Sequence, residues 1–308
     1  MGLGAGFKVS QLERQVREAE RLQQVAELAR IERALVTVHH QNFAPATRAF
    51  VPLPPRTDPA PIEGRLREIH IGALGLFEFA KRRQVAEWAR QAAFGQAQEA
   101  DARMQAEYQR LMRDADLEWR KLVDHDPVAV RAALEAAFDD DRAPAVCLDV
   151  DDEDGVRYAT VAVLFPGLGL VPEKCATVTP AGRPTLKPRT KTDRNQVYLA
   201  ALGSTVLAAV KEGFAAAPSV QEFRVVAVRV AARQVNGFEA VFAGRFDRER
   251  CQATPWTRID PAEALAGVPG GLLRRTGRTR EVAALDPSAE PGLAAVLAAL
   301  ADGLAADV

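Results

Sequence analysis

The sequence contains few of the residues that mark several protein classes. Its three cysteines, Cys147, Cys175 and Cys251, are odd in number and far apart, which argues against a disulfide framework or a zinc-binding pattern. Aromatic residues make up only 6%, and 40 basic residues against 41 acidic ones leave a net charge of −1. The whole molecule is therefore not an evident polyanion binder, and only local basic patches could have that role.

Long apolar runs and targeting signals are also missing. No apolar run approaches the ~18 residues that a membrane-spanning helix needs. The N-terminus "MGLGAGFKVS" lacks the basic start and the apolar core of a signal peptide. Widely spaced, unpaired cysteines fit a reducing compartment. We therefore expect a soluble cytoplasmic protein that does not associate with membranes.

Catalytic motifs are scarce as well. The four histidines, His39, His40, His70 and His125, all lie in the N-terminal part of the chain, and none belongs to an HExxH pattern. The phosphate loop GxxxxGK[ST] and the nucleophile motif GxSxG are both absent. The sequence therefore predicts no catalytic residue, no cofactor and no bound metal, and it favours a protein that is not an enzyme.

The first 143 residues are predicted to be mainly helical. Good helix formers dominate residues 1–43, where Ser10 and Glu13 match a capping box. Residues 44–61 form a proline-rich linker, which is either extended or a turn that folds the flanking helices into a hairpin. Residues 62–143 form a long helical or coiled-coil region, because a seam with two acidic members alternates by four and three: Ala97, Asp101, Met104, Tyr108, Leu111, Ala115, Glu118 and Leu122. We expect this arm to form a homo-oligomer or to dock a helical protein partner.

The periodicity changes after Pro144, so residues 144–308 are expected to form a separate α+β domain. Two strand pairs are predicted, one across the acidic turn at 151–155 and one across the Asn-Gly pair of "QVNG". Between them, residues 192–218 form the strongest predicted helix, capped by Thr192 or Asp193 and apolar nearly all round. The predicted fold class is α+β: a long helical arm or hairpin, then a compact domain whose antiparallel sheet packs on a central helix.

Two basic clusters are the candidate binding residues. Residues 184–199, "PTLKPRTKTDRNQVYL", lead into the central helix, and helix N-termini attract phosphates. Asp193 can satisfy the same N–H groups, so a solvated loop remains an alternative to a phosphate or nucleic-acid contact. The candidates are Lys187, Arg189, Lys191 and Arg194 in this loop and Arg274, Arg275, Arg278 and Arg280 in "LLRRTGRTR". A shared groove for the two clusters would indicate a polyanion site.

Two other functions stay open at this point. Asp149, Asp151 or Glu173 could act with Lys174 or Lys187 in a nucleic-acid-processing or phosphate-handling enzyme. Alternatively, the chain is a structural scaffold subunit whose basic clusters are simply exposed.

Residues 119–286 resemble uncharacterised actinobacterial proteins in which a helical, coiled-coil-like stretch precedes an α+β module. The segment "TPAGRPTLKPRTKTDRNQVY" carries the strongest likeness. This resemblance implies the same arrangement of an arm and a module. It implies no activity and no catalytic residues.

Overall fold

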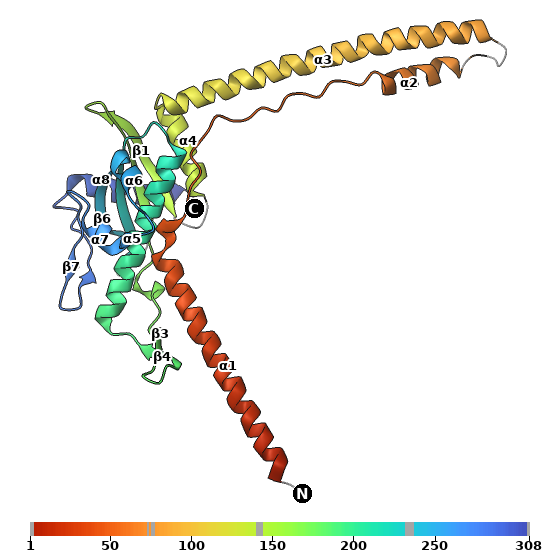
Figure 1. Ribbon diagram of the computed structural model, residues 1–308. Coiled ribbons are helices and arrows are strands. Elements are labelled where there is room, and N and C mark those ends of the chain that lie inside the picture. The colour runs from red at the N-terminus through yellow and green to blue at the C-terminus, as the bar shows by residue number, and fades with distance from the viewer. Residues whose placement is uncertain (1–2, 73, 75–77, 140–143, 232–236, 307–308) are drawn as a thin grey trace. The chain divides into compact units, whose positions relative to one another are not determined.

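The structure is a computed structural model that describes residues 3–72, 74, 78–139, 144–231 and 237–306. It is 53% helix and 19% strand, which confirms the α+β class. The chain divides into two compact units: unit 1 comprises Met1–Ala46 and Leu122–Val308, and unit 2 comprises Thr47–Lys121. Figure 1 shows the elements of each unit.

A four-stranded sheet organises unit 1. Its strand order is β1 (Ala145–Glu153), β2 (Val156–Leu164), β5 (Glu222–Val230) and β6 (Phe238–Asp247). The predicted strand pairs β1–β2 and β5–β6 are antiparallel, whereas β2 and β5 run parallel. The sheet is thus rich in antiparallel pairs, with one parallel pair at its centre. Asn236 of the predicted Asn-Gly turn lies outside the described residues.

Helix α5 (Lys191–Ala216) connects the two parallel strands and packs on one face of the sheet. Sixteen of its residues are buried, including Leu202, Val206 and Val210, as expected for a helix that is apolar nearly all round. The cap is Thr190, whose Oγ1 accepts a hydrogen bond from Asp193 N at 3.1 Å, so the predicted caps Thr192 and Asp193 lie inside the helix. Its length and composition would also allow it to cross a membrane, but 78% of its most apolar window is buried inside the protein.

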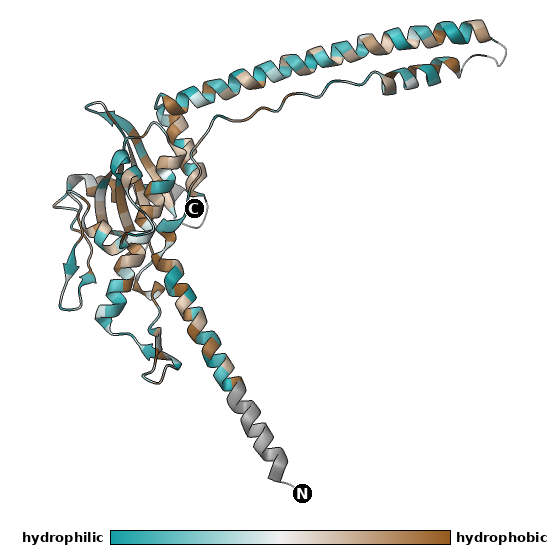
Figure 2. Ribbon diagram, in the orientation of Figure 1, coloured by the Kyte–Doolittle hydropathy of each residue, from teal (hydrophilic) through white to brown (hydrophobic). Residues whose placement is uncertain are grey.

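Further helices cover both faces of the sheet. On the α5 side lie α4 (Pro127–Phe138), which Asp126 caps as predicted, and α7 (Pro261–Ala266). The α8 helix (Pro291–Ala306) covers part of the other face through Leu293 and Leu300. Hydrophobic residues are concentrated on the strands and on α5, whereas hydrophobic and hydrophilic residues alternate along the whole length of α3 (Figure 2). The core of unit 1 therefore lies between the sheet and α5.

The end of the first helix also belongs to this core. α1 (Leu3–Val36) begins before Ser10, so Ser10 lies inside the helix and is not its cap. Leu35, together with Val38 of the short helix η1 (Val38–His40), packs against the core cluster that surrounds α5. The hairpin of β3 (Lys174–Val178) and β4 (Pro184–Pro188) packs along α1, where Arg21 bonds the Thr185 hydroxyl. Residues 1–46 are therefore part of the α+β unit.

Unit 2 consists of α2 (Ala60–Ile71), most of α3 (Phe79–Val123) and an extended segment, residues 47–59, which we term the strap. The strap runs along α3 (Figure 1), with Thr57 N 2.7 Å from the Asp101 carboxylate and Arg48 Nε 2.7 Å from that of Asp116. Arg48, Val51, Pro54 and Thr57 are half-buried at every third residue, which is the period of a polyproline II helix. The predicted linker is thus an extended segment held against α3.

Candidate functional site

The basic loop before α5 contains two arginines that serve the fold. The Arg189 side chain is only 3% exposed and forms ion pairs with Glu32 of α1 and, at 3.0 Å, with Asp193. Arg194 donates to the carbonyls of Val171 at 3.1 Å and Leu168 at 3.2 Å. A buried guanidinium between two carboxylates is already neutralised. Arg189 and Arg194 are therefore not available to a ligand anion.

Lys187 and Lys191 of the same loop remain exposed. Lys187 lies on β4 and Lys191 is the first residue of α5, and neither forms an ion pair with a described residue. A cation in the first turn opposes the positive end of the helix dipole, which disfavours this position by about 0.3–1 kcal/mol. Lys191 thus does not stabilise α5 through the helix dipole.

The second basic cluster lies on the hairpin of β7 (Arg275–Thr276) and β8 (Glu281–Val282). Its turn uses positive φ angles of 66° at Gly277 and 52° at Arg280. All four arginines, Arg274, Arg275, Arg278 and Arg280, are exposed. The hairpin therefore presents these side chains to solvent rather than to the core.

A buried amide brings the two clusters together. Asn195, in the first two turns of α5, is 5% exposed, and its Nδ2 donates to the Thr279 carbonyl at 3.0 Å. Thr279 lies between two of the exposed arginines, and β8 also packs against α5. This hydrogen bond thus joins the start of α5 to the β7–β8 turn. We term the exposed cations of the two clusters, Lys187, Lys191, Arg274, Arg275, Arg278 and Arg280, the basic face.

The basic face lies at the carboxyl edge of the parallel strands. Because β2 and β5 are parallel, both end at the edge where α5 begins. Arg229, near the end of β5, donates to Val282 O of β8 at 3.3 Å, which fixes the basic hairpin at this edge. Ligands of open α/β sheets bind outside the carboxyl ends of strands, beside helix N-termini. This position suits recognition of phosphate groups.

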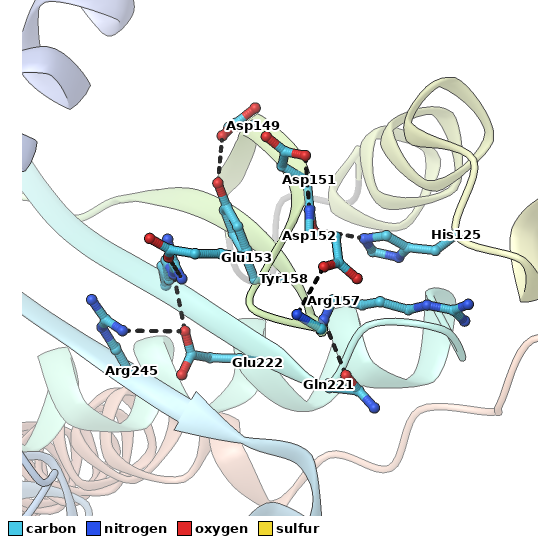
Figure 3. Close-up of polar contacts among 12 residues, drawn as sticks. His125, Asp149, Asp151, Asp152, Glu153, Arg157, Tyr158, Gln221, Glu222 and Arg245 are labelled. Atoms are coloured by element: carbon cyan, nitrogen blue, oxygen red, sulfur yellow. Dashed lines mark hydrogen bonds and ion pairs between the residues drawn. The ribbon is translucent and has the colours of Figure 1, made fainter.

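Two acidic residues of the enzyme hypothesis, Asp149 and Asp151, lie away from the basic loop. Figure 3 shows Asp149, Asp151 and Asp152 on the β1–β2 hairpin, with Tyr158 reaching toward Asp149. This hairpin turns at the amino end of β2, whereas Glu173 and Lys174 follow its carboxyl end. No group of three or more potential metal ligands occurs among the residues that were described. The structure thus leaves Asp149 and Asp151 on β1, whereas Glu173 directly precedes Lys174 at the start of the β3–β4 hairpin that also carries Lys187.

Buried histidines and cysteines have structural surroundings. His39 Nδ1 is 2.9 Å from Ser204 Oγ, and His125 contacts Ser219 Oγ at 3.1 Å and the Asp151 carbonyl at 3.0 Å. Burial raises the pKa of the Cys147 thiol to about 11 and that of Cys251 to about 12. Neither thiol forms the thiolate that a nucleophile needs near neutral pH.

Sequence reasoning missed Asn195, although the sequence contains a signal for it. A polar amide close to Tyr198 and Leu199 sits on an otherwise apolar, buried stretch of helix. Such a group needs a hydrogen-bond partner, and here the partner lies 84 residues away.

Comparison with protein-family models, with curated proteins and with solved structures finds no match to this chain.

Proposed function

We propose that the protein is a non-enzymatic binding protein whose unit 1 recognises polyanions, such as nucleic-acid backbones, through the basic face. The observation that supports this most directly is the hydrogen bond between Asn195 and Thr279, which joins two basic segments that are distant in sequence. Clustered cations on one surface provide the electrostatic contact that phosphates require.

The charge of these segments supports the same proposal. Residues 171–196 and 272–286 together contain ten basic and four acidic residues, in a chain whose net charge is −1. Two of the acidic residues, Asp193 and Glu173, face the structural arginines Arg189 and Arg194. The exposed cations therefore keep an excess of positive charge at this edge.

The proposal can be tested by binding to a labelled duplex DNA, measured by fluorescence anisotropy over a salt series. Each phosphate contact lowers the slope of log K against log salt by ~0.9. K187E/K191E and R278E/R280E should each weaken binding and reduce the slope by roughly two contacts. The proposal fails if the wild type does not bind at low salt, or if these variants leave the slope unchanged.

A matched control reverses two exposed arginines outside the basic face, in R250E/R258E. Arg248, two residues before Arg250, donates to the last carbonyls of α5, so Arg250 lies at the far end of this 26-residue helix, ~39 Å from its first residue. Arg258 lies beside the middle of α5, between Trp256, which Lys211 contacts, and Pro261, which packs at Gly203. The control carries the same change in charge. If it weakened binding as much as K187E/K191E, attraction to the whole molecule rather than to the basic face would be responsible.

A second function, assembly through the arm, is favoured by the side chains of unit 2. Among residues with described side chains, the exposed Phe and Trp residues, Phe50, Phe79, Trp88 and Phe94, all lie there. The buried residues of α3 are alanines, at 89, 93 and 97. A segment that exposes aromatic rings and buries only small residues gains stability from a partner.

Light scattering of the full chain tests this second function. We expect an oligomer at micromolar concentration that F79S/F94S dissociates, because both rings would lose their contacts with the partner. The exposed-site control Q96S/Q98S should leave the mass unchanged. A wild-type monomer at all concentrations would exclude self-association and leave docking of a different protein as the role of the arm.

A further inference from the structure

A groove lies on the face of the sheet that α5 does not cover. It has a volume of about 590 Å³ and runs between the sheet and α8. This volume is within the range of small-molecule sites. The groove is on the opposite face of the sheet from α5, so any ligand there is independent of the basic face.

The strand register places a row of polar residues across the floor of this groove. Asp149 pairs with Thr160, Thr160 with Arg224, and Arg224 with Arg245. Because neighbours in register point to the same face, all four line the groove. With strands ~4.8 Å apart, the row extends about 14 Å from Asp149 on β1 to Arg245 on β6.

The wall next to this polar row is apolar. Val226 and Ala243, the next pair in register on the same face, line the groove together with Leu272. Leu293 and Val296 of α8 cover the groove on the side opposite the sheet. A ligand that lies along the polar row therefore contacts an apolar surface along its length.

The central cation of the row is already paired. The Arg224 guanidinium lies 3.5 Å from the centre of the Tyr158 ring, donates to Glu222 at 2.9 Å and also contacts Glu153. These three contacts neutralise its charge and fix its orientation. Arg224 therefore acts as the middle of the floor, whereas the two ends of the row remain open to a ligand.

The two ends carry opposite charges with weak partners. The Arg245 side chain is 65% exposed and, among the described residues, pairs only with the half-buried Glu222, at 3.8 Å, a long contact of little energetic value (Figure 3). Within the described part of the chain, the Asp149 carboxylate bonds only the Tyr158 hydroxyl, at 3.4 Å, which is beyond the usual O–H···O distance. Glu290, just before α8, also lines the groove and forms no ion pair with a described residue. The groove thus offers carboxylates and one guanidinium to a ligand.

We propose that this groove binds a short apolar peptide with free termini. The ammonium group lies at Asp149, the terminal carboxylate at Arg245, and the side chains contact the apolar wall. An extended chain spans up to ~3.3–3.6 Å per residue, so three to four residues match the length of the row. A longer peptide would not bring both termini to the two ends.

Calorimetric titration of the full chain with the tetrapeptide Ala-Val-Leu-Ala tests this proposal. Charge-assisted contacts predict that N-acetylation or C-amidation each weakens binding about tenfold. D149N should bind the free and the acetylated peptide equally, and R245Q should bind the free and the amidated peptide equally. The controls D151N and R258Q, outside the groove, should discriminate between these peptides as the wild type does.

The comparison of blocked peptides uses the wild-type protein, so it remains decisive if a variant fails to fold. Weaker binding of both blocked peptides, abolished selectively in D149N and R245Q, supports the proposal. Equal binding of free and blocked peptides, no binding at millimolar peptide, or identical effects of D149N and D151N would each overturn it.

Discussion

Acid should destabilise unit 1 through His39. This side chain is 1% exposed, lies against Ser204 of α5, and has Lys211 within 2.7 Å of its own carbonyl oxygen. Burial lowers its pKa to about 4, with smaller contributions from the charges of His40 and Lys211 and an opposing one from Asp260. The folded state therefore holds the neutral imidazole.

The sign and size of the effect follow from this pKa. Above pH ~6.5 His39 is neutral in both the folded and the unfolded state, and its full contribution to the free energy of unfolding is present. Between pH ~6.5 and 4 only the unfolded state binds it, so the free energy of unfolding falls by ~1.4 kcal/mol per pH unit. The total loss is about 3 kcal/mol, and the contribution levels off once the folded state is protonated as well.

The assay is urea unfolding at pH 7, 6, 5 and 4.5, followed by the fluorescence of Trp256 in a W88F/W119F background. Trp256 packs against the core of unit 1 and is the one tryptophan that remains. H39Q should reduce the fall in unfolding free energy over this range by most of ~3 kcal/mol, whereas H40Q should not, because His40 is exposed. Equal pH slopes for wild type and H39Q would refute the assignment.

Three further outcomes follow from packing. A Cβ at Gly203 would lie 2.2 Å from the Pro261 carbonyl oxygen, so G203A should cost roughly 1–3 kcal/mol in urea unfolding. A Cβ at Gly95 meets nothing within 4 Å, so G95A, the matched change in an open helical site, should stabilise α3 by up to ~1 kcal/mol, seen as a higher melting temperature by circular dichroism. Arg131 donates to two carbonyls of the edge strand β1, so R131A should increase self-association, measured by light scattering, and unchanged scattering would contradict this role.

Local patterns made much of unit 1 predictable. The apolar run from Val197 to Phe214 predicts a buried helix, and α5 is one. Asp126 followed by proline marks the start of α4, where its carboxylate accepts from Ala129 N at 2.9 Å. Both strand pairs were likewise visible, because alternation and turn residues are properties of short segments.

Contacts between distant residues were not predictable in the same way. The parallel pairing of β2 with β5 depends on how α5 packs back on the sheet, which no short pattern records. Arg189 and Lys187 look equivalent in the sequence, yet only Arg189 is buried. It forms an ion pair with Glu32, which lies 157 residues earlier in the chain. The composition of the candidate site therefore depends on tertiary contacts, whereas the presence of two basic segments does not.

The heptad spacing of α3 shows how one pattern allows two structures. Alternation by four and three predicts a seam that needs a partner, and Asp101 within it would be unfavourable in the core of a coiled coil. In unit 2 the strap contacts this seam at Asp101, whose carboxylate accepts the backbone N–H of Thr57 at 2.7 Å. The acidic seam position thus has a specific partner within the same chain. A partner of the arm must either displace the strap or bind the exposed rings of Trp88 and Phe94, and only the second route leaves these contacts intact.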